Sequence, residues 1–320
     1  MLATRPPRPP RQATAPDGRS AAARPAAAAL HALSGHAPLL DRLRAGAWGA
    51  RVHSVFDRAI NIKDRDGRLF TLVARGLGDA PNTLVVDVDA FGRFNIGVGD
   101  AVAAHGGGLR LGRMAITLRL AAPWHAVLHA FPADVTRLQA NLRTVRAALA
   151  RHVQATRAAR GTDPFAVAVD EALAGRVASV RAALARKDAP DFVREGVQLL
   201  GLGVGLTPSG DDVLVGLFAA LHVPGSPLAP LRAACAAIAA EAPVRTNAIS
   251  AAAVVAAAGG EVRASILALV RDTMAGSPEA ALAALARVLA IGSTSGSDLA
   301  EGVASGLDIT LQAGGAFPCP

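Results

Sequence analysis

Two carboxylates stand side by side at Asp211 and Asp212, where a glycine-rich stretch runs into an apolar segment. Residues 201–212 read GLGVGLTPSGDD, so Thr207 and Ser209 add two hydroxyls beside the acids. The proline between them is tolerated in a first helical turn, because the N–H that proline lacks has no partner there. The stretch predicts a loop that ends at a helix start and gathers N–H groups, hydroxyls and carboxylates in one place.

A second segment near the C-terminus repeats this pattern. Residues 292–302 read GSTSGSDLAEG and align with residues 205–216 when one gap is placed opposite the proline. The aligned pairs are Gly205 with Gly292, Thr207 with Thr294, Ser209 with Ser295, Gly210 with Gly296, Asp212 with Asp298, and Gly216 with Gly302. If the two helices that follow pack as a pseudo-repeat, both turns can face one cavity that accepts a small charged metabolite.

Each segment alone also fits an ordinary helix cap. Ser-x-x-Asp before an apolar run is a capping box, in which the serine and the acid satisfy backbone N–H groups. A capping box needs neither two adjacent acids nor the costly glycines at Gly201, Gly203 and Gly205. Dense glycine indicates close approach of the backbone to another group, and a helix N-terminus favours an anion. No Lys or Arg follows the run, so it is not a phosphate loop of the Walker type.

A third polar cluster lies between the two copies, at residues 241–250. Its proline is expected to end one helix, and Thr246 or Asn247 to cap the next, with Ser250 one turn further on the face of Thr246. Arg245 offers a guanidinium that can bind a planar carboxylate through two hydrogen bonds. The alternative is an ordinary cap beside a surface arginine.

These three motifs resemble those of a known family. The loop at 201–212, the TNAIS at 246–250 and the final GSTSGSD are similar to the family of the AllH-type subunit of oxamate carbamoyltransferase, over about residues 52–307. The resemblance implies a role in allantoin breakdown, where a complex of several subunits exchanges oxalurate and phosphate for oxamate and carbamoyl phosphate. It assigns no catalytic residue. Ser293 stands where we expect a histidine, which leaves room for another substrate.

Two functions are compatible with these residues. In a catalytic or co-catalytic subunit, Asp211, Asp212 and Asp298 hydrogen-bond a carbamoyl NH2 group or hold Mg²⁺. Carbamoyl transfer needs mainly positioning and donors directed at the developing oxyanion, so no covalent nucleophile is required. The expected substrate-binding residues are Gly203, Gly205, Thr207, Ser209, Gly210, Arg245, Thr246, Asn247, Ser250, Thr294, Ser295 and Gly296. The alternative is a non-catalytic scaffold or regulatory subunit that binds a metabolite. No organic cofactor is expected, and Mg²⁺ is possible.

The basic charge of the chain does not indicate a nucleic-acid partner. The formal net charge is +8, but five arginines against one aspartate in residues 1–25 supply +4, which leaves 8 − 4 = +4 for the other residues. Aromatic residues, which stack on bases, make up only 3%. The expected partners are therefore a small anionic substrate and the other subunits of a carbamoyltransferase complex.

The sequence also predicts the compartment. The first 25 residues contain no apolar stretch typical of a secretory signal. No segment offers 18 uninterrupted apolar residues, so no membrane span is expected. Cys235 and Cys319 are too few for a disulfide framework. We expect a cytoplasmic protein.

Hydrophobic periodicity predicts an α+β fold, with a small N-terminal antiparallel β barrel or sandwich followed by a larger all-helical domain. Residues 1–30 mix Pro, Arg and Ala and are expected to be a disordered tail. Residues 31–132 contain short alternating runs between glycine-rich turns, including a hairpin signal at Asp66 and Gly67. Residues 133–320 show apolar spacings of three and four, which indicate helices.

The histidines give weaker signals. His125 and His129 have the spacing of two metal ligands on one helical face, but no third ligand is evident. His53 and Ser54 follow each other on the first predicted strand. Neighbours on a strand point to opposite faces, so these two cannot serve one site unless a bulge intervenes.

Overall fold

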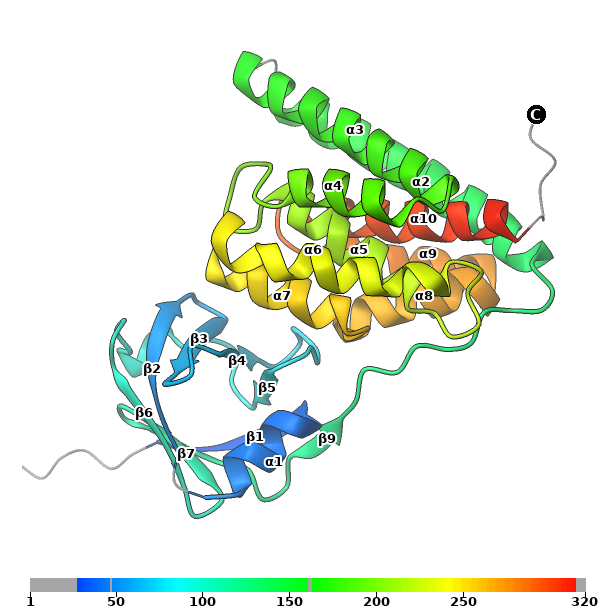
Figure 1. Cartoon of the computed structure of the whole chain (residues 1–320). Coiled ribbons are helices and arrows are strands. Elements are labelled where there is room, and N and C mark those ends of the chain that lie inside the picture. The colour runs from blue at the N-terminus through cyan, green and yellow to red at the C-terminus, as the bar shows by residue number, and fades with distance from the viewer. Residues whose placement is uncertain (1–27, 47, 161–162, 315–320) are drawn as a thin grey trace, which may run out of the picture.

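The structure is a computed structural model that describes residues 28–46, 48–160 and 163–314. A strand barrel is joined to a bundle of helices (Figure 1), which confirms the predicted α+β class. The predicted tail at residues 1–30 lies outside the described residues except for 28–30, which belong to the first strand. Cys319 also lies outside them.

The barrel is a closed ring of short strands. In the described chain these are β1 (Ala28–His36), β2 (Trp48–Val55), β3 (Ala59–Asp64), β4 (Leu69–Ala74), β5 (Thr83–Val86), β6 (Ala101–His105), β7 (Gly108–Leu111), β8 (Met114–Thr117) and β9 (Ala122–Trp124). Their order is β5-β4-β3-β2-β6-β7-β8-β1-β9, and β1 also pairs with β5, which closes the ring. The predicted barrel is confirmed, with parallel pairings of β1 with β8 and β9, and of β4 with β5.

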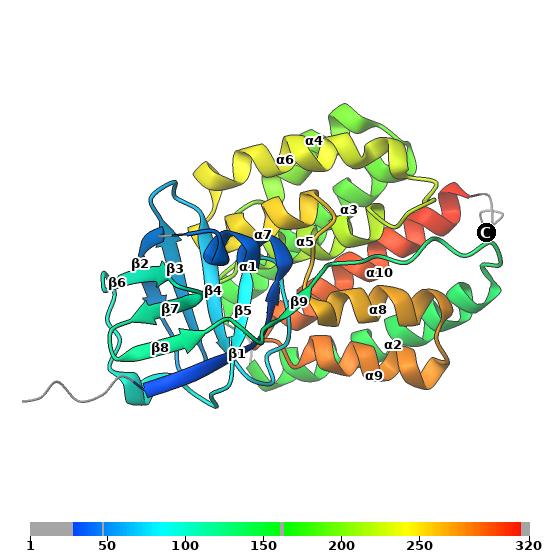
Figure 2. The same cartoon turned by 90° about the horizontal axis from the view of Figure 1, so that it is seen from below.

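The interior of the barrel is apolar. Helix α1 (Ala37–Arg44) adds Leu39, Leu40 and Leu43 to its core (Figure 2). The hairpin predicted at Gly67 joins β3 to β4, and Asp64 Oδ1 accepts the N–H groups of Asp66 and Arg68 at 2.9 and 2.8 Å. These contacts fix the register of the two strands that face the helical domain.

The helical domain surrounds one buried helix, α5 (Ser209–Leu221), which is apolar after its first turn. The helices of this domain are α2 (Thr136–Arg160), α3 (Pro164–Ala185), α4 (Ala189–Leu199), α5 (Ser209–Leu221), α6 (Arg232–Arg245), α7 (Ala248–Ala258), α8 (Ala264–Ala275), α9 (Pro278–Leu289) and α10 (Ser295–Ala313), with a short 3-10 turn at η2 (Ala229–Leu231). A further 3-10 turn, η1 (Gly92–Phe94), lies in the barrel domain between β5 and β6. Every residue of α5 from Gly210 to Leu221 is buried. None of the helices in the described chain combines the length and apolar character needed to cross a membrane.

Helices α5 and α10 pack with their backbones in contact. A Cβ atom at Gly216 would lie 2.1 Å from the carbonyl oxygen of Leu299, and one at Gly302 would lie 2.1 Å from that of Val213. These two glycines are aligned positions of the sequence repeat. The two helices therefore pack as a pseudo-repeat, and this crossing brings their N-terminal ends together.

One local prediction is wrong, and one spacing in the sequence has no helical counterpart. The proline expected to end α6, Pro243, lies inside that helix, which continues to Arg245. Proline removes one N–H and clashes with the preceding turn, but with only two helical residues beyond it the helix is not broken. His125 and His129 lie between β9 and α2, outside any helix, so their spacing does not place them on one helical face.

Candidate functional site

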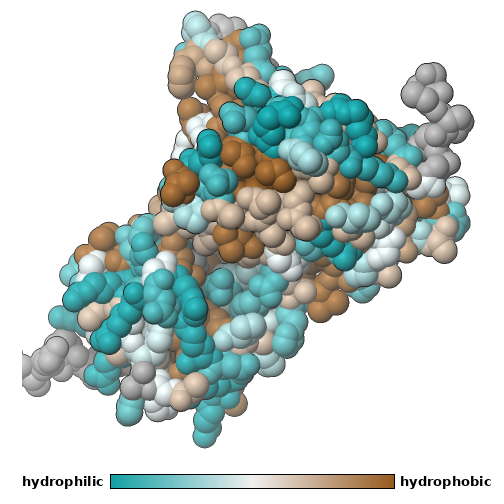
Figure 3. Space-filling view, viewed as in Figure 1, coloured by the Kyte–Doolittle hydropathy of each residue, from teal (hydrophilic) through white to brown (hydrophobic). Residues whose placement is uncertain are grey.

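A cavity of about 560 Å³ lies between the outer face of the barrel and the helical domain. The barrel wall comes from β3, β4, β5 and the loop before β5. The helical wall comes from the glycine loop, α5, α7, the start of α8 and the turn before α10. Figure 3 shows that apolar and polar residues both reach the surface at the waist where the two parts meet.

The two repeated helix starts meet at this cavity. The hydroxyl of Thr207, before α5, is hydrogen-bonded to the hydroxyl of Ser295, at the start of α10, at 2.7 Å. Neither Ser209 nor Ser295 serves as an N-cap, since Pro208 and Thr294 hold those positions, and neither of these makes a side-chain cap hydrogen bond. The predicted alternative, in which each serine only caps its own helix, does not describe this geometry.

Asp212 lines the cavity, as does Glu261, whose side chain is 42% exposed. Asp212 differs from Glu261 in its surroundings. It is buried, and its Oδ2 has no hydrogen-bond partner within the described residues. Burial raises the pKa of Asp212 to about 7, the hydroxyls of Ser295 and Thr207 oppose this rise, and the charges of Asp298 and Asp211 add to it. The result is a carboxyl group that changes protonation near neutral pH.

Asp211 has a different position and holds the loop. It is 1% exposed, accepts the N–H of Gly201 at 2.9 Å and accepts a hydrogen bond from the hydroxyl of Thr246. Burial raises the pKa of Asp211, while the hydrogen bonds from Thr246 and Gly201 and the nearby hydroxyl of Ser250 lower it. Asp211 therefore ties the beginning of the glycine loop to the segment before α7, and it does not line the cavity.

Asn247 holds the other end of the loop. Its Oδ1 accepts the N–H groups of Ile249 and Ser250 at 3.0 and 3.1 Å, which confirms the predicted cap of α7. Its Nδ2 donates to the carbonyl oxygen of Leu206 at 2.8 Å. One side chain thus caps a helix and positions the loop that forms the cavity rim.

The glycines allow this close arrangement. Gly203 has a φ of 127°, and a Cβ there would lie 2.5 Å from the nitrogen of Ser209. A Cβ at Gly210 would lie 2.0 Å from the carbonyl oxygen of Leu199, and one at Gly296 would lie 2.2 Å from that of Val288. Larger residues at these positions would push the loop and helix starts apart.

The backbone N–H groups of the glycine loop are a further feature of the site. Within the described chain, the N–H groups of residues 203–207 donate to no backbone carbonyl. The loop therefore has N–H groups without a backbone acceptor, and residues 204–207 of it line the cavity.

The arginine that lines the cavity is Arg263 and not the predicted Arg245. Arg245 is exposed, lies 3.6 Å from Glu241 and does not line the cavity. Arg263 does line it. Its Nη2 donates to the carbonyl oxygen of Leu77, at 3.2 Å, in the barrel loop. Burial lowers the pKa of Arg263 and the charge of Asp212 raises it, yet no carboxylate of the described chain lies within ion-pair distance.

One feature of the sequence could have identified Arg263. Arg263 is the N-cap residue of α8, where the helix dipole disfavours a cation. A residue that violates a local preference often has a functional reason. Arg245, in the last turn of α6, follows the preference and is exposed.

The remaining predicted residues divide into two sets. Those that line the cavity are Gly205, Thr207, Asp212, Thr294 and Ser295. Those that lie behind or beside it are Gly203, Ser209, Gly210, Asp211, Arg245, Thr246, Asn247, Ser250, Gly296 and Asp298. No three His, Cys, Asp or Glu side chains of the described residues come together as a metal site. Cys235 is buried, and burial raises the pKa of its thiol to about 12.

Comparison with protein families matches both parts of the molecule. The model described as the oxamate carbamoyltransferase subunit AllH matches residues 199–307, which contain both helix starts and Arg263. The model described as the AllH family N-terminal domain matches residues 31–123, which form the barrel. No solved structure matches the chain significantly. The resemblance read from the motifs is confirmed, and the chain belongs to the AllH family of oxamate carbamoyltransferase subunits.

Proposed function

We propose that this chain supplies the substrate cavity of a carbamoyltransferase complex that exchanges oxalurate and phosphate for oxamate and carbamoyl phosphate. The observation that carries the proposal is the meeting of two repeated helix starts, joined by the Thr207–Ser295 hydrogen bond of 2.7 Å, at a cavity that also holds Arg263. The family name describes a subunit, which implies partner subunits. The substrates and the residue roles below are our proposal.

Arg263 is the proposed anchor for the charged end of the substrate. A guanidinium binds carboxylate or phosphate through two parallel hydrogen bonds, and its attraction is stronger where water is excluded. The N–H groups of residues 203–207 and the hydroxyls of Thr207 and Ser295 supply neutral donors around it.

The buried acid in the cavity, Asp212, is compatible with an anion because of its pKa. A fully charged Asp212 would repel phosphate or a carboxylate. With a pKa of about 7, the carboxyl of Asp212 is protonated in a large fraction of molecules at neutral pH and then donates a hydrogen bond. Binding of an anion favours that protonated form further.

The same carboxyl group fits the proton transfer that carbamoyl exchange requires. An oxygen of hydrogen phosphate bonds to the carbamoyl carbon of oxalurate, and the bond from that carbon to the oxamate nitrogen breaks. The nitrogen keeps the electron pair and takes a proton from Asp212, and the proton released by the hydrogen phosphate restores the Asp212 carboxyl. A general acid with a pKa near the working pH is suited to this step.

Phosphate-dependent cleavage of oxalurate tests the proposal. The full chain is assayed alone and with the proteins that co-purify with it. Arg263→Gln is expected to lower kcat/KM by about 100-fold, as the loss of a charge-stabilising donor typically does, while the matched surface variant Arg245→Gln stays close to wild type. The double variant with Asp212→Asn and Asp298→Asn is expected to assemble and to be inactive.

The alternative role, a scaffold or regulatory subunit without chemistry, predicts a different pattern. In that case the double variant assembles with its partners and turnover persists. Unchanged turnover in both Arg263→Gln and the double variant would exclude the proposed cavity as the reaction site.

A further inference from the structure

The barrel gives the cavity a second wall of different chemistry. Asn61 on β3 and Thr71 on β4 are register partners, and both line the cavity. The hydroxyl of Thr71 donates to Asn61 Oδ1 at 2.8 Å, and Asn61 Nδ2 donates to the hydroxyl oxygen of Ser54 at 2.9 Å. This wall contains neutral amide and hydroxyl groups, whereas the helical wall contains Arg263 and Asp212.

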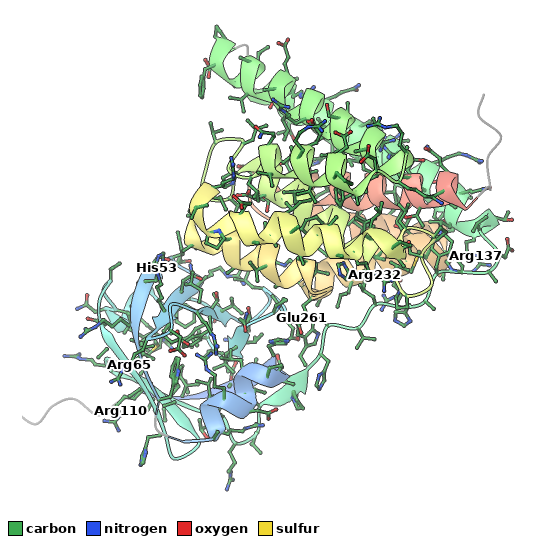
Figure 4. All side chains as sticks on the ribbon, in the orientation of Figure 1. His53, Arg65, Arg110, Arg137, Arg232 and Glu261 are labelled. Atoms are coloured by element: carbon green, nitrogen blue, oxygen red, sulfur yellow. The ribbon has the colours of Figure 1, made fainter. Side chains whose placement is uncertain are left out.

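A bulge in β2 builds this wall. The register shifts between Val52 and Ser54, so His53 is an extra residue and Ser54 pairs with Asn61. Bulges re-aim side chains in this way. As a result His53 Nδ1 is hydrogen-bonded to the Ser54 hydroxyl at 3.2 Å. Neighbouring strand residues can serve one site only where a bulge intervenes, and β2 has such a bulge between Val52 and Ser54. Figure 4 shows His53 at the barrel edge nearest the helices.

The alternation of β3 explains why Asn61 faces the cavity. Ile60 and Ile62 are fully buried in the barrel core, so Asn61 between them points out of the barrel. Asn61 is nevertheless only 6% exposed, because the helical domain covers this face. A polar residue on a covered outer face needs hydrogen-bond partners, and only part of the hydrogen-bonding capacity of Asn61 is used.

After its hydrogen bonds to Ser54 and Thr71, the Asn61 amide still has one N–H donor and one carbonyl lone pair that could bind a partner. A primary amide has two N–H groups and two carbonyl lone pairs. Ser54 uses one N–H and Thr71 uses one lone pair, and the described chain provides no partner for the others. A buried donor without a partner costs about 1–3 kcal/mol. A ligand that offers an acceptor and a donor side by side recovers this cost, and a carbamoyl or primary amide group has that arrangement.

We propose that Asn61 recognises the neutral carbamoyl or amide end of the ligand, opposite the helical wall that holds its charged end. Ser54, Thr71 and His53 are positioning residues that fix the orientation of the Asn61 amide. This inference rests on the proposed function, because it assigns the two ends of one ligand to the two walls of one cavity.

Calorimetric titration of the full chain with three probes tests the inference. Oxamate and oxalate share a carboxylate and differ in having an amide or a second carboxylate, and inorganic phosphate carries charge alone. Wild type is expected to prefer oxamate to oxalate. Asn61→Ala is expected to weaken oxamate binding by about tenfold or more, because a site built to bind an amide then lacks its partner, and to leave phosphate binding unchanged.

Two further variants make the result independent of misfolding. Asn61→Asp keeps the size and can accept from both hydroxyls but loses the N–H donors, and it is expected to lose oxamate affinity while its thermal denaturation stays cooperative. Thr71→Val is expected to give a smaller loss than Asn61→Ala. Thr117→Ala, on β8 and outside this cavity, is the control and is expected to leave all three affinities unchanged.

The outcomes separate this inference from the proposed function. If Arg263→Gln weakens all three probes while both Asn61 variants bind oxamate as wild type does, Asn61 is only a cross-link between strands and the inference fails. Equal weakening of all three probes by Asn61→Ala also overturns it. If wild type binds no probe, or Arg263→Gln changes none, the proposed function itself fails.

Discussion

At the residue scale, the burial of Asp212 has a consequence for stability. Its pKa in the folded chain is raised to about 7 from an ordinary value of 3.8. The folded state therefore holds a proton that the unfolded state has lost, and this contribution to stability falls as pH rises from about 4 to about 7. Asp212→Asn mimics the protonated group without titrating.

We expect Asp212→Asn to unfold at higher urea concentration than wild type above pH 7. Three pKa units correspond to a gain on the order of 2–4 kcal/mol, at 1.36 kcal/mol per unit. The gain should shrink as pH falls and vanish below about pH 4, where the carboxyl of wild type becomes protonated in both states. Urea unfolding of both proteins across this range measures it, and parallel stability curves would show that Asp212 is charged in the folded chain.

The amide of Asn247 makes two kinds of hydrogen bond, and their contributions can be measured separately. Its Oδ1 caps α7, and its Nδ2 donates to Leu206 in the glycine loop. Asp also caps helices well, but it cannot donate. Asn247→Asp is therefore expected to keep the thermal stability of wild type and to weaken phosphate binding several-fold by loosening the loop. Asn247→Ala removes both kinds of hydrogen bond and should also lower stability, by about 1 kcal/mol. Similar stabilities and affinities for the two variants would contradict this division.

At the element scale, the site depends on the contact between α5 and α10. A Cβ at Gly216 or Gly302 would come within 2.1 Å of a backbone oxygen of the other helix, so alanine at either position forces the helices apart. We expect each alanine variant to lose about 1–3 kcal/mol of stability, as overpacked sites do, and to lower oxamate binding because the helix starts separate.

Gly175 in α3 is the matched control for these variants. A Cβ there meets nothing within 4 Å, so Gly175→Ala is expected to stabilise the chain by about 0.5–1 kcal/mol through helix propensity. Urea unfolding of the three variants measures the contrast. If all three alanine variants change the free energy of unfolding in the same way, backbone entropy determines the effect of these glycines and the contact between α5 and α10 does not.

At the scale of the whole molecule, local patterns predicted the site better than they predicted contacts between domains. The two helix starts were found because repeated residue types and their capping chemistry are local. Arg263 is not identified from the sequence, because its position in the cavity depends on where the barrel loop with Leu77 packs. Alternation shows which face a strand buries but not which strand lies beside it, so the parallel neighbours of β1 were not predicted. The bulge before Ser54 likewise appears only when β2 is paired with β3.

The two domains have separate hydrophobic cores, and the cavity forms only where the two domains pack together. One cluster of buried apolar residues lies within the barrel and α1, and another lies within the helices. The domains meet through the cavity and through polar contacts. Ala264 donates its N–H to the backbone carbonyl oxygen of Asp79 at 2.9 Å, and His36 Nε2 lies 3.4 Å from Glu261 Oε1. Figure 4 shows Glu261 where the two parts meet.

Each domain should therefore fold alone, while the ligand needs both. We expect fragments 28–126 and 127–314 to show cooperative unfolding when expressed separately, because each keeps its own core. This cut leaves Leu128 and Phe131 with the helices on which they pack. Oxamate should bind the helical fragment at least about tenfold more weakly than the full chain, since the barrel wall is missing, and mixing the fragments should recover part of the affinity. Calorimetry on the fragments and their mixture measures this, and full affinity in the helical fragment alone would show that the barrel has no part in recognition.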